Sequence, residues 1–410
     1  DTERPSFMRR LRNLRRNIGR EGLGYLFSRL GEFVVAFLDW LAAATVAKGE
    51  VLALLRRAFP QRPFSLEDFT RLYGTPVVHV WNLNNVQAAT ILQDLHADLG
   101  IVLGTRILKR STFSLPRLGC INVHLGKVPE YRGMPPGFWE LYEDQPSAGV
   151  TIHFVDDGLD TGDVIGQQII PIDTLDSVET LQKKLGLVAS ELLARCVGEV
   201  RDGQALRQKQ ATNPRKPRTT PTRKQRWELE TRRGLSARRR GRSVYALKTC
   251  FYLIVYYSGL FHLLRGVRGI WGPGRACIVL YHRVNDLNED ALTTSLGRFA
   301  EHMLVLQRYY SVISTSALIE NLQSGKWLSG HPAAIHFDDC YKDVLTHAAP
   351  ILAEAKLSAC CFVSSGYIGT DRVFPHDLEL SPFQIENLTA SDLRDLLRNG
   401  LEIGSHSVNH

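Results

Sequence analysis

Two places in the sequence combine residue types that can do chemistry. The first is the pair Asn122 and His124 at the end of the apolar run CINVH, with Asp160 following in the segment LDTGD. An amide and an imidazole can donate to the oxyanion that forms when an amine attacks an acyl carbon, and a carboxylate can orient the imidazole. These residue types suit acyl transfer to an amine. Spacing alone leaves an alternative open, because an isolated Asn-x-His at a strand end is more often structural.

The second place joins two aspartates with two histidines. Asp338 and Asp339 follow the run AAIHF, and the segment HSVNH contains His406 and His410. Histidines four residues apart lie on one face of a helical turn, so His406 and His410 could converge with an aspartate on a metal ion. One Asp and two His leave a position for water, which suits Zn²⁺ or another divalent ion of intermediate softness. The other aspartate could take a proton from that water. Taken alone, H-x-x-x-H more often marks surface histidines.

Short apolar runs alternate with helical patterns around the first site. Strands are predicted at 77–80, 99–104, 120–124, 149–155 and 164–172, and helices at 86–96 and 175–200. We expect Asn84 or Asn85 to cap the first helix, and Asp173 or Thr174 to cap the second. Strands that alternate with helices indicate a parallel α/β sheet.

The same alternation continues around the second site. Strands are predicted at 274–284, 333–337, 358–364 and 401–405, with a helix around 341–355. The fold class is therefore α/β in both parts, after a segment at 1–60 that reads as helical. In open α/β sheets, sites form beyond the carboxyl ends of strands. Both groups of candidate residues fall at such positions.

Positive charge is concentrated in one connector. The 410-residue chain has a net charge of +8, but residues 213–243 hold twelve Lys or Arg and two Glu, or +10, which leaves the rest near −2 (8 − 10 = −2). Three prolines among these residues favour a solvated linker. The alternative is contact with anionic lipid or nucleic acid. The apolar segment 244–264 predicts a core or interfacial helix rather than a membrane span, so peripheral membrane contact through 213–264 is the corresponding hypothesis.

The cysteines argue against a disulfide framework. There are seven, an odd number, and none form a C-x-x-C pair. This pattern is typical of buried free thiols in a reducing compartment. No signal peptide is visible, so we expect a cytoplasmic protein, with membrane association as the variant that the basic connector allows.

The stretch CINVHLGKVPEYRG…GVTIHFVDDGLDTGDVI resembles the folate-dependent formyltransferase family over roughly residues 75–200. That family includes methionyl-tRNA formyltransferase, glycinamide ribonucleotide transformylase and the sugar-nucleotide N-formyltransferases. The resemblance implies a Rossmann-like parallel sheet and 10-formyltetrahydrofolate as donor. It also implies that Asn122, His124 and Asp160 are catalytic. The residues expected near the folate pterin or at the mouth of the site are Val102, Leu103, Gly104, Thr105, Arg132 and Gly133.

Two departures from the formyltransferase pattern bear on the acceptor and the donor. The loop after His124 reads Leu-Gly-Lys-Val-Pro, where tRNA formyltransferases typically carry Ser-Leu-Leu-Pro. This argues against nucleic acid as acceptor and favours a small amino sugar or sugar nucleotide. The family's first strand–helix–strand unit is not seen before the helical segment. We therefore expect the chain to be a fragment, in which donor binding is in doubt.

The motifs VLYHRV, HFDDCYKD and LEIGSHSVNH together resemble the NodB-like polysaccharide deacetylase family over residues 276–410. That family folds as a distorted (β/α) barrel, so a partial barrel is expected here. By this resemblance Asp338 is the general base, and Asp339, His406 and His410 bind the metal. Cys340 stands where the family has a glycine that tolerates positive φ. The later family motifs are not seen, and we expect no deacetylase activity from these 410 residues.

The predicted organisation has five parts. These are a helical segment at 1–60, a formyltransferase-like domain at 61–205, a basic linker at 206–243, an apolar helix at 244–270 and a partial deacetylase-like domain at 271–410. The leading hypothesis is a bifunctional enzyme of carbohydrate metabolism that acts on sugar nitrogens. The alternatives are a methionyl-tRNA formyltransferase-like enzyme, or a membrane-peripheral scaffold with decayed sites.

Overall fold

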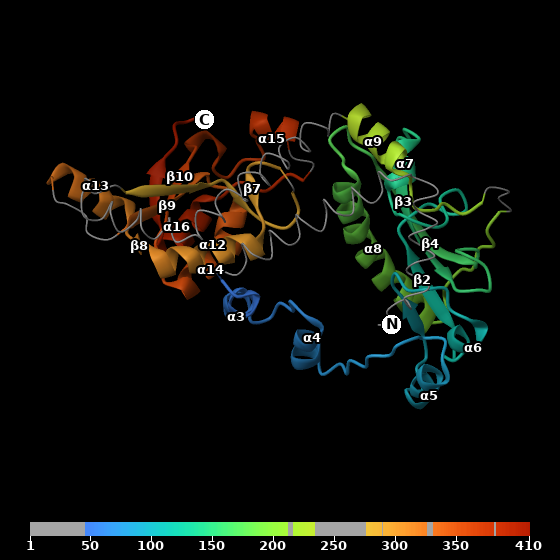
Figure 1. The fold of residues 1–410 in the computed structure, drawn as a ribbon. Helices are drawn as coiled ribbons and strands as arrows, with labels where there is room; N and C mark the ends of the chain where they lie inside the picture. Colours follow the sequence, from blue (N-terminus) through green and yellow to red (C-terminus); the bar gives the residue numbers. More distant parts are fainter. Residues whose placement is uncertain (1–45, 212–215, 234–275, 289, 326–330, 381–382) are drawn as a thin grey trace. The chain divides into compact units, whose positions relative to one another are not determined.

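The chain forms two compact units, and each is described by itself (Figure 1). The computed structural model describes residues 46–211, 216–233, 276–288, 290–325, 331–380 and 383–410. Of these, residues 78–233 build the first unit, and residues 46–77 and 276–410 build the second. Residues 1–45 of the predicted helical segment and the whole of the predicted apolar helix at 244–270 lie outside the described residues.

The first unit is built on a four-stranded sheet. Its strands are β1 (Gly100–Val102), β2 (Cys120–His124), β3 (Ser147–Phe154) and β4 (Val164–Pro171), in that order. The α/β class is confirmed, but the sheet is mixed: β1 and β2 are parallel, whereas β3 and β4 run antiparallel to their neighbours. The loop 155–163 between β3 and β4 is too short for a crossover, which takes a dozen or more residues. A hairpin is the only connection that such a loop permits.

Helices cover and bound this sheet. They are α5 (Val86–Asp94), α6 (Arg110–Phe113), α7 (Phe138–Tyr142), α8 (Val178–Arg201) and α9 (Arg223–Arg232). Asn85 caps α5 as predicted, because its side chain accepts a hydrogen bond from the Ala88 N–H. The predicted cap of α8 was wrong: Ser177 forms a capping box with Thr180 there. The apolar face of α8 packs on β3 and β4 and closes the core with Leu181, Leu185 and Leu192.

Two predictions for the first unit differ from the structure. Residues 77–80 form no strand in the described part of the chain, and Val77 and Val78 are exposed there. Part of the predicted basic linker is instead packed on the first unit. Gln208 pairs with Val164, Arg218 pairs with Gly133, and α9 contacts α7. Backbone pairing and the burial of Leu229 hold this stretch, so it is not a solvated connector.

The second unit has a parallel sheet. Its strands are β5 (Cys277–Tyr281), β8 (Ser311–Val312), β9 (Pro332–Asp339), β10 (Cys360–Val363) and β11 (Glu402–Ser405), ordered β11-β10-β9-β5 with β8 also on β9. β6 (Arg283–Val284) and β7 (Thr293–Thr294) form a separate pair. The predicted strand at 274–284 is thus split, and Ile278 and Leu280 are exposed. Within the described residues the sheet is an open arc, and a closed barrel stays a prediction.

Helices surround the second sheet. They are α3 (Lys48–Ala58), α4 (Leu66–Tyr73), α12 (Leu296–Tyr309), α13 (Thr315–Gln323), α14 (Ala349–Ala355), α15 (Pro375–Leu380) and α16 (Ala390–Arg398), with short turns η2 (Val344–Ala348) and η3 (Ser365–Tyr367). α3 packs on α12 and α14 through Leu54 and Leu55. The predicted boundary between residues 60 and 61 is therefore wrong, since residues 46–77 lie with the second unit.

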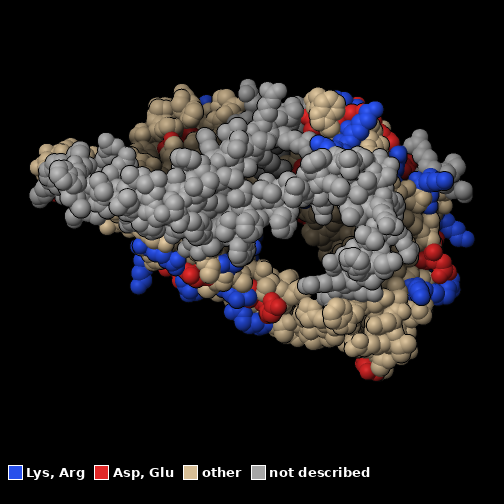
Figure 2. Space-filling view, viewed as in Figure 1, with Lys and Arg blue, Asp and Glu red and all other residues tan. Residues whose placement is uncertain are grey.

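No helix in the described ranges is both long enough and apolar enough to cross a bilayer. On the described surface in Figure 2, Lys and Arg lie interspersed with Asp and Glu. Two arginines of the basic stretch are paired within the first unit, Arg218 with Glu143 and Arg232 with Asp144. Some of the positive charge near the predicted linker is thus neutralised locally.

Candidate functional sites

The first site stands on two neighbouring antiparallel strands. Asn122 and His124 are two residues apart on β2, so their side chains lie on the same face. The register pairs Asn122 with His153 and His124 with Thr151 on β3. Directly paired residues have Cβ atoms about 5 Å apart. Four polar side chains therefore share one face of two otherwise apolar strands.

Asp160 reaches this face from the loop between β3 and β4. Its carboxylate accepts hydrogen bonds from Asn122 Nδ2 at 3.4 Å and from the Gly133 N–H at 3.0 Å. Its oxygens lie 3.6 Å from His124 Nδ1 and 3.6 Å from His153 Nε2. The structure thus brings together the three residues predicted to act in acyl transfer, and adds a second histidine.

Hydrogen bonds decide which imidazole nitrogens carry hydrogen. His124 Nε2 lies 2.8 Å from the Tyr131 carbonyl, and His153 Nδ1 lies 2.8 Å from the Phe154 carbonyl. A carbonyl can only accept, so both nitrogens are donors. His153 Nε2 is left to accept from Asn122 Nδ2 at 3.2 Å. In neutral His124, the lone pair is then on Nδ1, the atom that faces the carboxylate.

Two glycines allow the backbone to come close enough for this arrangement. A Cβ on Gly126 would lie 2.6 Å from His124 Nε2 and 2.7 Å from the Tyr131 carbonyl oxygen, and would displace their hydrogen bond. At Gly162 an added Cβ would overlap the Phe154 carbonyl. Both positions therefore require glycine for close approach.

Burial and charge set the protonation states of the pair. Burial lowers the pKa of His124, although the charge of Asp160 and the hydrogen bond to Tyr131 oppose it. Burial raises the pKa of Asp160, but the two neighbouring histidines and the Gly133 N–H outweigh it and lower the pKa overall. Near neutral pH the site is thus an ionised carboxylate beside a neutral imidazole, which can act as a general base.

The residues expected near the folate lie at the end of β1 and after it. Val102 pairs with Asn122 in the parallel register, so this stretch begins beside the site. Leu103 is 62% exposed, Gly104 has φ +59° with open space around it, and the Thr105 hydroxyl donates to the next carbonyl. A folate contact by these residues stays a prediction.

The loop at the mouth of the site is held by a later segment. Gly133 donates to Asp160, and it pairs with Arg218. The Arg218 N–H donates to the Arg132 carbonyl at 2.7 Å, and the Met134 N–H donates to the Arg218 carbonyl at 3.2 Å. The geometry of Asp160 therefore depends on a stretch that the sequence alone assigned to a linker.

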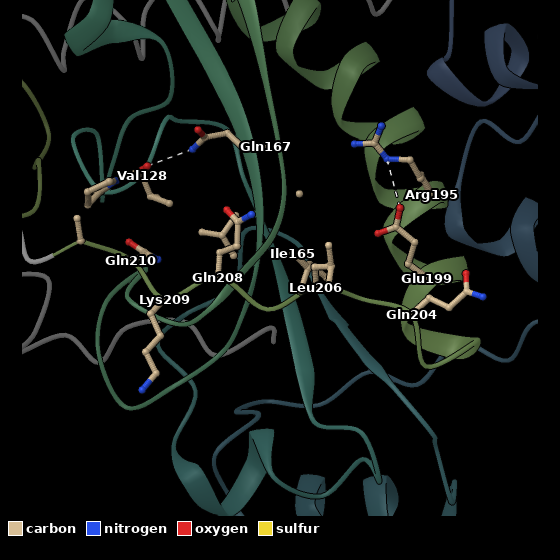
Figure 3. A pocket seen from close by; sticks show the side chains of 14 residues that line it. Val128, Ile165, Gln167, Arg195, Glu199, Gln204, Leu206, Gln208, Lys209 and Gln210 are labelled. Carbon is tan, nitrogen blue, oxygen red and sulfur yellow. Dashed lines mark hydrogen bonds and ion pairs between the residues drawn. The ribbon is translucent and has the colours of Figure 1, made fainter.

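A cavity of about 600 Å³ is lined by residues of β4, of α8 and of the segment that follows α8 (Figure 3). Four glutamine side chains contribute to its wall, from Gln167, Gln204, Gln208 and Gln210. Gln210 Nε2 donates to the Asp160 carbonyl at 3.0 Å and to the Gly162 carbonyl at 2.8 Å. Gln210 thus ties the segment after α8 to the loop that carries Asp160.

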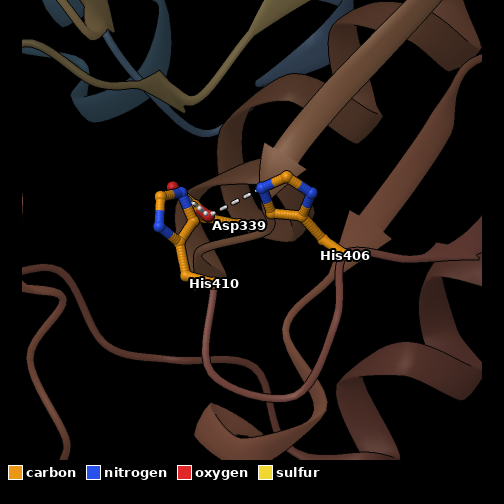
Figure 4. A group of neighbouring side chains, drawn as sticks. All are labelled: Asp339, His406 and His410. Atoms are coloured by element: carbon orange, nitrogen blue, oxygen red, sulfur yellow. Dashed lines mark ion pairs between the residues drawn. The ribbon is translucent and has the colours of Figure 1, made fainter.

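The second site gathers around one buried carboxylate. Asp339 ends β9, and one ligand atom from each of Asp339, His406 and His410 lies within 4.8 Å of the others (Figure 4). Asp339 Oδ1 is 3.6 Å from His406 Nε2 and 3.4 Å from His410 Nε2. Neither carboxylate oxygen has a hydrogen-bond partner among the described residues. An orphaned buried carboxylate facing two imidazoles fits a divalent cation, and the three predicted ligands are brought together.

The turn at the end of β9 has an unusual backbone conformation and carries two neighbouring carboxylates, Asp338 and Asp339. Asp339 has φ +64° and Cys340 has φ +57°, so Cys340 does occupy the positive-φ position where the family has glycine. Asp338 lies beside the site, and its charge, with that of Asp339, opposes the burial that lowers the pKa of His282. Burial raises the pKa of Asp339, although His410, His376, His282 and His406 oppose it. A bound cation would oppose that rise, because positive charge favours the ionised carboxylate.

The spacing of His406 and His410 predicted a shared helical turn, and this prediction was wrong. Residues 406–410 form a non-helical turn after β11, and Ser407 has φ +63°. A residue at positive φ cannot continue a right-handed helix. The imidazoles converge because the turn folds back over Asp339, not because of helical periodicity.

Three histidines at these sites were missed by sequence reasoning. His153 had a local signal, since Thr151 and His153 alternate within the apolar run GVTIHFV. His282 follows β5 and belongs to the motif VLYHRV. His376 has no such signal, because it comes from the short helix α15 and only the folded chain brings it to Asp339, at 3.5 Å.

Comparison with protein families finds two matches along the chain. Residues 69–197 match the Formyl transferase family, and residues 327–410 match the Polysaccharide deacetylase family. The chain is 30% identical over 190 residues to a methionyl-tRNA formyltransferase of Thermodesulfovibrio yellowstonii. This match covers 44% of this chain and 60% of that protein. It is 33% identical over 143 residues to the enzyme of the same name from Kosmotoga olearia, covering 35% of this chain and 46% of that protein. The chain thus spans less than two thirds of these relatives.

Solved structures resemble each part of the chain. The formyltransferase PseJ from Anoxybacillus kamchatkensis, solved with UDP-4,6-dideoxy-4-formamido-L-AltNAc and tetrahydrofolate, is 26% identical. That match covers 36% of this chain and 77% of PseJ, with a TM-score of 0.31. The deacetylase PplD from Streptococcus pyogenes, in complex with acetate, is 20% identical. That match covers 34% of this chain and 58% of PplD, with a TM-score of 0.29.

Proposed function

We propose that the first unit transfers a formyl group from 10-formyltetrahydrofolate to the amine of an amino sugar or sugar nucleotide. The observation that carries this proposal is the convergence of Asn122, His124 and Asp160 on one face of β2 and β3. The match of residues 69–197 to the Formyl transferase family supports the reaction class.

We assign each of these residues a separate role in the transfer. The incoming amine loses a proton as its nitrogen attacks the formyl carbon, and Nδ1 of neutral His124 would take this proton. Asp160 then stabilises the imidazolium that results. The Asn122 amide, whose two hydrogens face His153 and Asp160 in the free chain, would turn one of them from Asp160 to the oxygen on which negative charge develops. The folate supplies the activated formyl group, and Val102–Thr105 would contact its ring.

A sugar acceptor is favoured by two features of the chain itself. The loop after His124 carries Lys127 and Val128 in place of the run typical of tRNA formyltransferases. The second unit matches a family named for polysaccharide deacetylation. Both modules would then act on sugar nitrogens, one adding a formyl group and the other removing an acyl group.

The second unit is proposed to be the deacetylase-like module. Asp339, His406 and His410 would hold a divalent ion, with Zn²⁺ the best match to their chemistry. The ion would acidify a bound water when present. Asp338 would take the proton from that water, and N-acylated sugars are the proposed substrates.

A tRNA acceptor remains the second candidate, because the relatives above are named methionyl-tRNA formyltransferases. The two candidates are separated by offering the chain 10-formyltetrahydrofolate with either a panel of amino-sugar nucleotides or methionyl-tRNA. Formylated sugar nucleotide supports the first proposal. Formylated methionyl-tRNA without any sugar product would replace it with the second.

A further inference from the structure

Asp160 has a backbone conformation that needs support from its surroundings. Its φ of +54° lies in the left-handed region, which residues other than glycine rarely adopt. Such a conformation persists only where the surrounding structure holds it. Within the loop 155–163, the Asp156 carboxylate accepts hydrogen bonds from the Gly158 N–H at 3.0 Å and from the Thr161 hydroxyl at 2.7 Å. These bonds hold residues before and after Asp160 but leave its carbonyl without a donor.

One glutamine from outside the loop supplies that donor. Gln210 Nε2 donates to the Asp160 carbonyl at 3.0 Å and to the Gly162 carbonyl at 2.8 Å. Among the residues that the structure describes, no other donor reaches either carbonyl. A carbonyl oxygen can only accept, so the NH₂ group of Gln210 must face the loop. Both of its hydrogens are therefore used to hold the backbone on either side of Thr161.

The other amide atom of Gln210 shows that packing alone does not call for a glutamine here. Gln210 Oε1 is buried and has no hydrogen-bond partner within the described ranges. A buried acceptor without a partner opposes folding. A methionine of similar length would fill the same space without that penalty. We therefore assign the side chain to its two bonds with the loop.

The segment that carries Gln210 is itself anchored on the sheet (Figure 3). The Gln208 N–H donates to the Val164 carbonyl at 2.8 Å, and the Val164 N–H donates to the Gln208 carbonyl at 2.8 Å. Val164 is the first residue of β4 and follows the loop directly. Gln210 is thus two residues from a fixed point of the sheet, and its amide holds the loop from a rigid base.

We infer that Gln210 is a positioning residue for formyl transfer: it fixes the backbone of Asp160, so that the carboxylate stays on the catalytic face of β2 and β3. On that face the carboxylate accepts from the Gly133 N–H at 3.0 Å and lies 3.6 Å from His124 Nδ1. The bonds of Gln210 go to the loop backbone, so it acts through Asp160. This inference rests on the function proposed for the first unit.

The first test compares steady-state kinetics of the full chain with those of Gln210→Met, using 10-formyltetrahydrofolate and the amino-sugar nucleotide of the panel that the wild type formylates fastest. Without the two bonds the carboxylate can shift, and kcat should fall by about 10–100-fold. KM should change little, because Gln210 holds the loop rather than the acceptor. Gln210→Glu has the same shape, but an ionised carboxylate cannot donate, so it should show the same loss even if Gln210→Met fails to fold.

The matched control is Gln182→Met. Gln182 Nε2 also donates to a carbonyl of the first unit, that of Pro136 at 2.9 Å, but not to the loop that carries Asp160. This variant loses a bond of the same kind and should keep the kcat of the wild type.

A second readout follows the catalytic pair without any substrate. Burial lowers the pKa of His124, and His153 adds to this, whereas the charge of Asp160 and the bond to Tyr131 oppose it. If Gln210→Met releases the carboxylate, the His124 imidazole should titrate at a pH lower by up to about one unit. NMR of the histidine-labelled chain measures this, with the His124 signal identified by its absence from His124→Gln.

Wild-type kcat in both Gln210→Met and Gln210→Glu would overturn the inference, as would an unchanged His124 titration in Gln210→Met. An equal loss of kcat in Gln182→Met would also overturn it. If the wild type forms no formylated product, the proposed function fails, and the His124 titration alone then decides whether Gln210 positions Asp160.

Discussion

Replacing Arg283 with methionine should destabilise the second unit by about 3–5 kcal/mol. The Arg283 side chain is fully buried, with Nη1 2.6 Å from Asp377 Oδ1 and Nη2 2.9 Å from Asp290 Oδ1. Each pair attracts by roughly 5 kcal/mol at 3 Å and an effective dielectric constant of about 20, and desolvation offsets much of this. Methionine fills a comparable volume but leaves two buried carboxylates without their cation, and that uncompensated charge causes the loss.

Calorimetry of the chain measures this effect. Because the chain forms two compact units, we expect separate transitions, of which only that of the second unit should move. For a unit of this size the expected fall in Tm is roughly 6–20 °C. Arg308→Met is the control, because it breaks an exposed ion pair with Glu50 and should cost less than about 1 kcal/mol. A loss below about 1 kcal/mol in Arg283→Met would refute the reasoning.

Three further predictions concern the two sites. Asp160→Asn should lower kcat for formyl transfer by about 10²–10⁴-fold without unfolding the chain, since asparagine tolerates the φ of +54° found there; a rate within tenfold of wild type would contradict the assigned role. Burial raises the pKa of Glu140 to about 7, so the first unit should lose roughly 3 kcal/mol of unfolding free energy as the pH rises from below 4.5 through 7. Urea unfolding against pH should show that slope in wild type and not in Glu140→Gln. Asp339→Asn should abolish Zn²⁺ binding in a chelator competition, and retention of tight binding would show that the ion sits elsewhere.

The apolar runs predicted most strands because they reflect burial. CINVH, GVTIHFV and AAIHF are all strands with buried side chains. The direction of β4 was not predictable from alternation alone, because the length of the loop after β3 decides between a hairpin and a crossover. VVHV at 77–80 has the composition of a strand, but Val77 and Val78 are exposed and lack a neighbouring strand in the described chain.

The residues of the two sites also differ in whether the sequence could predict them. Asn122, His124 and Asp160 were predictable from the order of their motifs. The rule that sites form at the carboxyl ends of strands does not explain their meeting, because β3 runs antiparallel to β2 and its end lies beside Ile121. The approach of His376 to the second site was not predictable. Its neighbours there, Tyr341 and Asp339, are 35 and 37 residues away in sequence (376 − 341 and 376 − 339). Arg218 was assigned to a solvated linker because composition cannot show the backbone pairing that fixes it beside Gly133.

Formyl transfer itself is the central claim, and one measurement tests it most directly. The chain is incubated with 10-formyltetrahydrofolate carrying an isotopically labelled formyl group and a panel of amino-sugar nucleotides, and products are identified by mass spectrometry. We predict an N-formylated sugar nucleotide that carries the label with the wild-type chain, and none above background with His124→Ala. Absence of any labelled sugar product, or equal product from His124→Ala, would contradict the account.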